Sequence, residues 1–217
     1  MSTLLQAISS DLNLEAAYSW LCQARQAYSP HSDIWNLRRH WQHIKANLQN
    51  NLLNGTFHFS PMQQYRFPDR YLTLWCSLDA LVLRAMTQVL SEWICPMLTA
   101  VYHVKGKRGI GGALRSVQEN LSAHTFVLKT DIKQYYESIS HECLLKQLAV
   151  FIKDPLVLTL LKDALMRSET YGGLYWEVNV GIPMGSPLSP LLGAVALHAW
   201  DQARSNVVFF MPVLWMI

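Results

Sequence analysis

Two segments in the second half of the chain constrain its fold more than any other feature. Residues 126–139 (FVLKTDIKQYYESI) have the pattern of an apolar strand that ends in a carboxylate, Asp131. Residues 181–201 (GIPMGSPLSPLLGAVALHAWD) form a Gly/Pro loop followed at once by an apolar helix. The glycines permit close backbone approach, the prolines stiffen the loop, and Ser186 or Ser189 can cap the helix. The chain is therefore expected to contain an apolar strand that ends in a carboxylate and, roughly fifty residues later, a stiff loop that starts an apolar helix.

The size and composition of the chain favour a globular protein. Its 217 residues are 51% hydrophobic, enough to bury a core, and its net charge is only +3. The four cysteines are scattered without metal-ligand spacing and read as reduced thiols. No apolar stretch reaches the roughly 20 residues of a membrane span. We therefore expect a cytoplasmic protein without a membrane partner.

Helical and strand patterns alternate along the chain, which predicts an α+β fold with a small antiparallel sheet backed by helices. Residues 1–55 are interpreted as an N-terminal helical extension and residues 56–206 as the main domain. Helices are expected over 4–28, 33–53, 77–93, 113–123, 140–152, 155–167 and 188–201. Strand-like pieces are expected at 57–59, 71–75 and 125–131, with a hairpin around Gly172 and Gly173.

The segments 126–139 and 181–201 resemble motifs A and B of a reverse transcriptase palm. Together with residues 74–94 and the Gly-rich loop 103–112, they identify the chain as similar to bacterial reverse transcriptases of the retron and group II intron type. This resemblance spans about 57–201 and implies the fingers and part of the palm of a right-hand polymerase. It also implies RNA-directed DNA polymerase activity, with an RNA template, a DNA or RNA primer, dNTPs and two Mg²⁺ ions. Asp79 and Arg84 fit the helical motif as a structural ion pair.

The resemblance also implies roles for individual residues. Asp131 is expected to be the catalytic metal ligand, and Ile132 to offer its backbone carbonyl to the metal. Tyr136 falls where an aromatic steric gate excludes a ribose 2′-OH. Met184, Gly185 and Ser186 are expected at the nucleotide, although many relatives have Gln or Arg in place of Met184. Outside the motif, an Asp after a strand is more often a cap or turn residue, and paired tyrosines more often simply pack.

Basic residues before the first motif are candidates for nucleic-acid contact. Lys105, Lys107 and Arg108 lie in a Gly-rich loop and are expected to meet template phosphates, with a solvated basic loop as the alternative. Weaker candidates for contact with the triphosphate are Arg66, Arg70 and Lys129.

The end of the chain departs from the family pattern. No acidic residue follows Asp201, whereas the family continues to a Tyr-x-Asp-Asp motif that supplies two further metal carboxylates. The codons of Trp215, Met216 and Ile217 spell Asp-Asp in a shifted frame, so we interpret 207–217 as an out-of-frame tail. We therefore expect an inactive fragment. A non-catalytic RNA-binding remnant or scaffold is the alternative, and Tyr136 argues against an RNA-dependent RNA polymerase.

Overall fold

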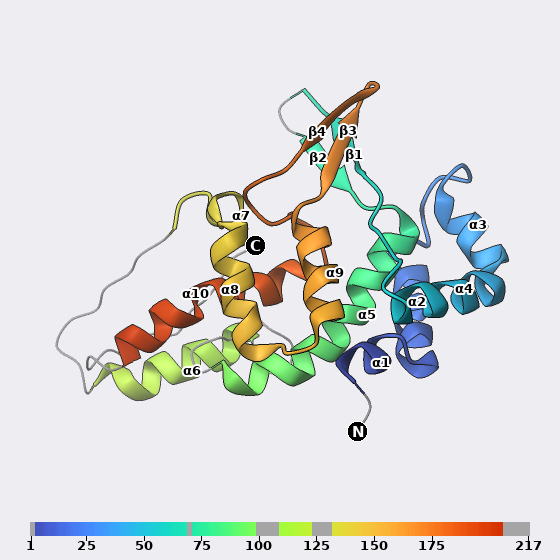
Figure 1. Cartoon of the computed structure of the whole chain (residues 1–217). Coiled ribbons are helices and arrows are strands. Elements are labelled where there is room, and N and C mark those ends of the chain that lie inside the picture. Colours follow the sequence, from blue (N-terminus) through green and yellow to red (C-terminus); the bar gives the residue numbers. More distant parts are fainter. Residues whose placement is uncertain (1–2, 69–70, 99–108, 123–131, 206–217) are drawn as a thin grey trace.

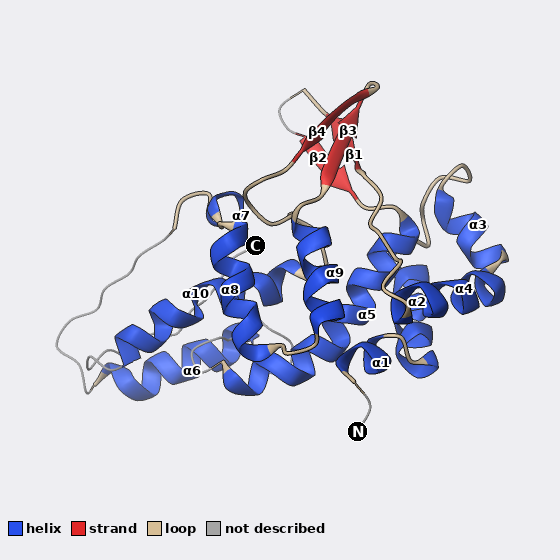
Figure 2. Ribbon diagram, viewed as in Figure 1, coloured by secondary structure: helices blue, strands red, loops and turns tan. Residues whose placement is uncertain are grey.

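Helices make up the body of the molecule and a small sheet stands at its upper edge in Figure 2. The computed structural model describes residues 3–68, 71–98, 109–122 and 132–205. Within these ranges the α+β prediction is confirmed. The predicted strand 125–131 lies outside the described residues, as does the tail 207–217.

Each of the two predicted N-terminal helices is divided into two. The first comprises α1 (Leu4–Ile8) and α2 (Asp11–Ala24), and the second comprises α3 (Asp33–Arg39) and α4 (Trp41–Leu53). The first break arises because Ser10 caps α2, its Oγ accepting the Asn13 amide at 3.4 Å. Apolar spacing continues across both breaks. The predicted spans therefore contain the observed helices, but each span is interrupted where one continuous helix was expected.

Helix α5 (Ser77–Ile94) is the central helix and packs against α1, α2 and α3. It is buried on all sides near its start, where Ala80, Leu81, Val82 and Leu83 follow one another in the core. We expect Ser77 to cap this helix from its sequence. The observed cap is the preceding residue, Cys76, whose Sγ accepts the Asp79 amide. A short 3₁₀ turn, η1 (Cys95–Met97), follows α5.

The sheet contains four strands in the order β2-β1-β3-β4. They are β1 (Met62–Arg66), β2 (Tyr71–Leu74), β3 (Ser168–Tyr171) and β4 (Leu174–Glu177). The β1–β2 and β3–β4 pairs are antiparallel, but β1 and β3 are parallel with Met62 opposite Glu169. The sheet is therefore mixed rather than wholly antiparallel. The hairpin prediction is confirmed, because Gly172 and Gly173 both have positive φ, at 58° and 81°.

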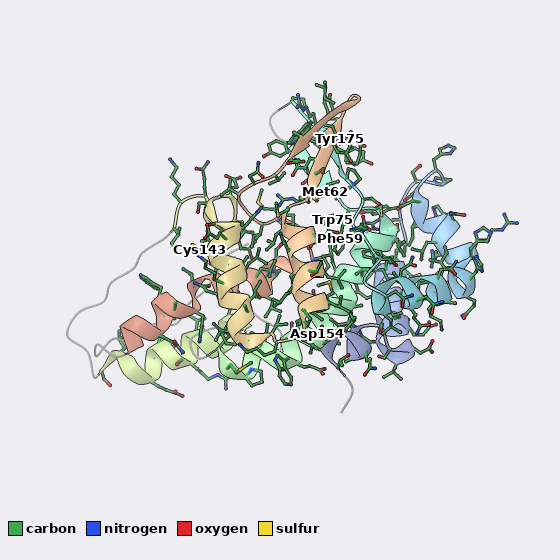
Figure 3. The ribbon with its side chains drawn as sticks, viewed as in Figure 1. Phe59, Met62, Trp75, Cys143, Asp154 and Tyr175 are labelled. Atoms are coloured by element: carbon green, nitrogen blue, oxygen red, sulfur yellow. The ribbon has the colours of Figure 1, made fainter. Side chains whose placement is uncertain are left out.

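Aromatic side chains anchor the sheet to the helices. The strand expected at 57–59 is wrong, since these residues are irregular and Phe57 packs edge-on against Phe59 with ring centroids 5.1 Å apart. Phe59 in turn lies 5.4 Å from Trp75. Figure 3 shows Phe59, Met62 and Trp75 gathered where the sheet meets the helical body, with Tyr175 farther out. The sheet therefore projects from an aromatic base.

The remaining helices are α6 (Gly109–Leu121), α7 (Tyr135–Ser138), α8 (His141–Phe151), α9 (Pro155–Leu165) and α10 (Ser189–Ser205). Helix α8 packs against α9 and α10 (Figure 1). Asp154 caps α9 and also accepts the Leu5 amide at 3.2 Å, which ties α1 to the second half of the chain. Among the described helices, none combines the length and apolarity needed to cross a membrane.

Candidate functional site

The segment after Asp131 turns sharply into a short helix. Ile132 is on the surface with 39% of its area exposed, and Gln134 has a positive φ of 51° immediately before α7. Such a φ is uncommon outside glycine and marks a tight turn. Asp131 lies outside the described residues, so the structure gives the position of its neighbour Ile132 and not of the carboxylate.

The loop before α10 is held in shape by its own hydrogen bonds. The Ser186 hydroxyl accepts the Leu188 amide at 3.4 Å, and the Ser189 hydroxyl donates to the Pro183 carbonyl at 2.5 Å. Both serines are buried. The tip of the loop is different: Met184 is 58% exposed, and Gly185, at φ 78°, has open space where a Cβ would be. The loop therefore has a buried base and an open tip.

Backbone hydrogen bonds join the loop to the segment that follows Asp131. The Gly181 amide donates to the Ile139 carbonyl and the Ile182 amide donates to the Tyr136 carbonyl, each at 2.8 Å. Ser140 and Val180 form an antiparallel bridge beside these bonds. A Cβ on Gly181 would lie 2.8 Å from the carbonyl oxygen of Glu137, so only glycine fits there without displacement. The structure thus brings together the two segments that the sequence marked as motifs.

The ring of Tyr136 rests against α10. A Cβ on Gly193 would be 3.0 Å from Cε1 of Tyr136, and the neighbouring Tyr135 donates its hydroxyl to the Gly193 carbonyl at 2.7 Å. The Tyr136 hydroxyl is buried and has no hydrogen-bond partner among the described residues, and burial raises its pKa. Burial also raises the pKa of Tyr135. Both rings therefore remain neutral phenols at neutral pH.

The other predicted residues are placed less directly. Met184 and Gly185 lie at the open tip of the loop, whereas Ser186 is 5% exposed and supports the loop from within. Lys105, Lys107, Arg108, Arg70 and Lys129 all fall outside the described residues. Arg66 is described, and it donates to Gln64 at 2.7 Å while its guanidinium covers the ring of Tyr171 at 4.2 Å.

The expected ion pair between Asp79 and Arg84 is wrong. Asp79 accepts the Ser60 amide at 2.9 Å, and Arg84 donates to Gln88 at 3.2 Å and covers the ring of Trp20 at 5.0 Å. Asp79 is one turn from the start of α5, where a carboxylate is favoured by the helix dipole. Both residues therefore have structural roles, but in separate places.

Two buried residues at the base of the loop were missed by sequence reasoning. His141 donates from Nε2 to the Gly181 carbonyl at 2.7 Å, and Arg167 donates from Nη1 to the same oxygen at 3.0 Å. His141 follows the first motif directly, which is a weak signal; Arg167 lies at the end of α9, where nothing in the local sequence points to the loop.

The described residues bring no three His, Cys, Asp or Glu side chains together as a metal cluster. The oxygen donors proposed from the sequence, the Asp131 carboxylate and the Ile132 carbonyl, are nevertheless of the type that Mg²⁺ prefers.

Comparison with known proteins finds similarity to several proteins, among them intron-encoded ones. No protein-family model matches it. It is 26% identical to Protein YkfC of Escherichia coli (strain K12) over 212 residues, which cover 88% of this chain and 56% of that protein. It is 32% identical to an uncharacterized 91 kDa protein in cob intron of Schizosaccharomyces pombe over 139 residues, covering 64% and 17% of the two chains. Group II intron-encoded protein LtrA of Lactococcus lactis subsp. cremoris is 25% identical over 166 residues, covering 73% and 28%.

A solved structure shows a related fold. A partial Cas6-RT-Cas1--Cas2 complex matches with a TM-score of 0.65 and 17% identity, over 94% of this chain and 35% of that chain. At this identity the likeness is one of fold. The chain spans 56% or less of the length of each relative named here.

Proposed function

Because this chain is a relative of the group II intron-encoded proteins and has the fold of a bacterial-type reverse transcriptase, we propose that it forms the nucleotide-binding part of an RNA-directed DNA polymerase. In this proposal residues 132–139 and the loop 181–188 make up one wall of the site. The substrates are a dNTP, an RNA template and a DNA or RNA primer.

The observation that carries the proposal is the direct pairing of the two motifs. Hydrogen bonds from Gly181 to Ile139 and from Ile182 to Tyr136 hold the loop against the residues that follow Asp131. A polymerase needs these two elements in contact, because one carries the metal-binding carboxylate and the other lies against the incoming nucleotide. The exposed loop tip at Met184 and Gly185 leaves the nucleotide side of this wall open.

Asp131 and the Ile132 carbonyl are the proposed Mg²⁺ ligands. When bound, two such ions activate the primer hydroxyl and neutralise charge on the phosphates. Tyr136 is proposed to lie under the sugar and to disfavour a 2′-OH, with its ring height set by contact with α10 at Gly193. Lys105, Lys107 and Arg108 are proposed to contact template phosphates, which would make binding of the template sensitive to salt.

The test is nucleotide binding by the purified chain in the presence of Mg²⁺ and a poly(rA)·oligo(dT) primer–template. We expect dTTP to bind more tightly than UTP, and Asp131→Ala to weaken dTTP binding while binding of the primer–template persists. Binding of RNA without any preference for dTTP would instead support the non-catalytic RNA-binding role.

Primer extension is scored in the same mixtures. The sequence predicts none from this chain alone, and that prediction stays open. Mg²⁺-dependent extension that disappears in Asp131→Ala would show that the chain catalyses synthesis by itself.

A further inference from the structure

Both backbone polar groups of Gly181, its N–H and its carbonyl, make hydrogen bonds. Its amide donates to Ile139, and its carbonyl accepts two hydrogen bonds, from His141 Nε2 at 2.7 Å and from Arg167 Nη1 at 3.0 Å. A carbonyl oxygen only accepts, so His141 carries a proton on Nε2. Gly181 opens the loop whose tip bears Met184 and Gly185. The position of the Gly181 backbone therefore sets where the loop begins.

The two donors are held away from water. His141 is 7% exposed and Arg167 is 8% exposed. A buried guanidinium is costly unless it is paired, and the Nε of Arg167 lies 3.6 Å from Oε1 of Glu169, which is itself 7% exposed. Burial lowers the pKa of Arg167, while the Glu169 carboxylate opposes that shift. Arg167 Nη1 also donates to the Leu165 carbonyl at 3.4 Å, so the bond to the Gly181 carbonyl is the shorter of its two.

Arg167 also links the loop to the sheet. It directly precedes β3, its own carbonyl accepts the Val178 amide at 3.0 Å, and Glu169 pairs with Met62 of β1. The same side chain thus contacts the loop at Gly181 while its backbone belongs to the base of the β3–β4 hairpin. Any shift of that hairpin acts on the loop through Arg167.

We propose that His141 and Arg167 are positioning residues for the incoming nucleotide, acting through the Gly181 carbonyl. This inference rests on the function proposed above. The tip of the loop makes few contacts with the described residues. Met184 is exposed, and a Cβ added to Gly185 would have none of their atoms within 4 Å. The loop is therefore held at its base by the backbone hydrogen bonds of Gly181 and by the hydrogen bond from Ser189 to Pro183. The position of this base sets where the tip lies.

The experiment compares variants of the full chain. Arg167→Met and His141→Leu remove the donors, and His141→Gln keeps a donor near the Nε2 position. The matched control is Arg25→Met, because Arg25 is also 8% exposed and donates to Ser77 and to the Trp75 carbonyl, away from the loop. Three quantities are measured: the thermal midpoint, amide hydrogen exchange at Gly181 and Ile182, and the affinity for dTTP with Mg²⁺ and primer–template.

We expect both donor-removing variants to accelerate exchange at Gly181 and Ile182 and to weaken dTTP binding roughly tenfold, the loss expected for one buried hydrogen bond. Arg25→Met should lower the thermal midpoint without either effect, and His141→Gln should restore both. Two results would overturn the inference. In the first, the donor-removing variants lower the thermal midpoint as much as Arg25→Met does but leave amide exchange and dTTP affinity unchanged. In the second, amide exchange becomes faster while dTTP affinity is unaltered.

Two further outcomes are separable. If the unaltered chain binds no dTTP, the proposed function has failed, and exchange at Gly181 and Ile182 alone decides whether the pair positions the loop. If one of the two donor-removing variants does not fold, the other carries the same comparison with Arg25→Met, because each removes one donor to the Gly181 carbonyl.

Discussion

The amide of Ile182 donates a hydrogen bond of 2.8 Å to the carbonyl of Tyr136, which joins the loop before α10 to the short helix α7. Because the bond is made by backbone atoms, it does not depend on the identity of either side chain. It links the backbone of Tyr136 directly to the base of the loop.

Gly181→Ala should destabilise the protein far more than Gly173→Ala. Both glycines have similar positive φ, 85° and 81°, so both substitutions pay the same backbone cost of about 1 kcal/mol. Only at Gly181 does the added Cβ also collide with backbone, 2.8 Å from the Glu137 oxygen, whereas at Gly173 nothing lies within 4 Å. We expect an extra loss of about 2 kcal/mol at Gly181, measured by urea unfolding. Equal losses would show that the loop can move away without cost.

Tyr136→Phe should leave stability unchanged or raise it by up to about 1 kcal/mol. Within the part of the chain that the structure describes, the hydroxyl is buried and meets no hydrogen-bond partner, so removing it relieves a desolvation cost. The ring is kept, and the preference for dTTP over UTP should persist. Tyr136→Ala should reduce that preference, because no ring then meets the 2′-OH. The exposed Tyr175→Ala, on the sheet, is the control that should change neither quantity. A clear loss of stability in Tyr136→Phe would reveal a partner for the hydroxyl.

Asp79→Asn should remove part of the pH dependence of stability. Burial, with a smaller effect of Asp163, raises the pKa of Asp79 from 3.8 to about 6. The folded protein therefore retains a proton that the unfolded chain releases, and this contribution is complete below pH 3.8 and lost as the pH rises through about 6. The loss amounts to about 2 kcal/mol between pH 4.5 and 7. Asparagine keeps an acceptor for the Ser60 amide, so the variant should show a flatter profile.

The comparison at each pH isolates Asp79, since Asp201, whose pKa burial also raises to about 6, is present in both proteins. Urea midpoints at pH 4.5 and 7 provide the measurement. Parallel profiles for the two proteins would mean that Asp79 titrates near its ordinary value.

Leu81→Ala should cost about 2–5 kcal/mol, because Leu81 is fully buried near the start of α5 and its truncation leaves a cavity. Leu12 on α2 is 87% exposed, so Leu12→Ala should be close to neutral. Thermal or urea unfolding of both variants checks the contrast. A large effect at Leu12 would indicate that α2 is covered by something else in solution.

Local signals in the sequence predicted much of the fold. Ser140 and Asp154 cap α8 and α9 with their own side chains, and Pro155 starts α9 as expected. The glycine pair at 172 and 173 makes its two-residue turn because both positions need positive φ. In each case the determining contact lies within a few residues of chain, which is the range that pattern reasoning can read.

The features that were missed depend on distant contacts. The first strand lies at Met62–Arg66 rather than 57–59 because Phe57 and Phe59 are drawn into an aromatic cluster with Trp75. Asp79 likewise contacts a residue that is distant in sequence: it accepts the Ser60 amide instead of pairing with Arg84. The convergence of Arg167 and His141 on one carbonyl is set by the packing of three elements, and no local pattern encodes it.

The parallel pairing of β1 with β3 has a consequence for how the chain is made. Helices α1, α2 and α5 can pack on one another once residue 94 has left the ribosome, because all their mutual contacts lie in that stretch. The β1–β2 hairpin must then wait, with one edge open, until β3 has been synthesised, and an isolated two-stranded hairpin is only marginally stable. Synthesis of the intervening residues is thus the interval in which β1 is exposed to wrong partners, and slowing translation there should increase aggregation of the nascent chain.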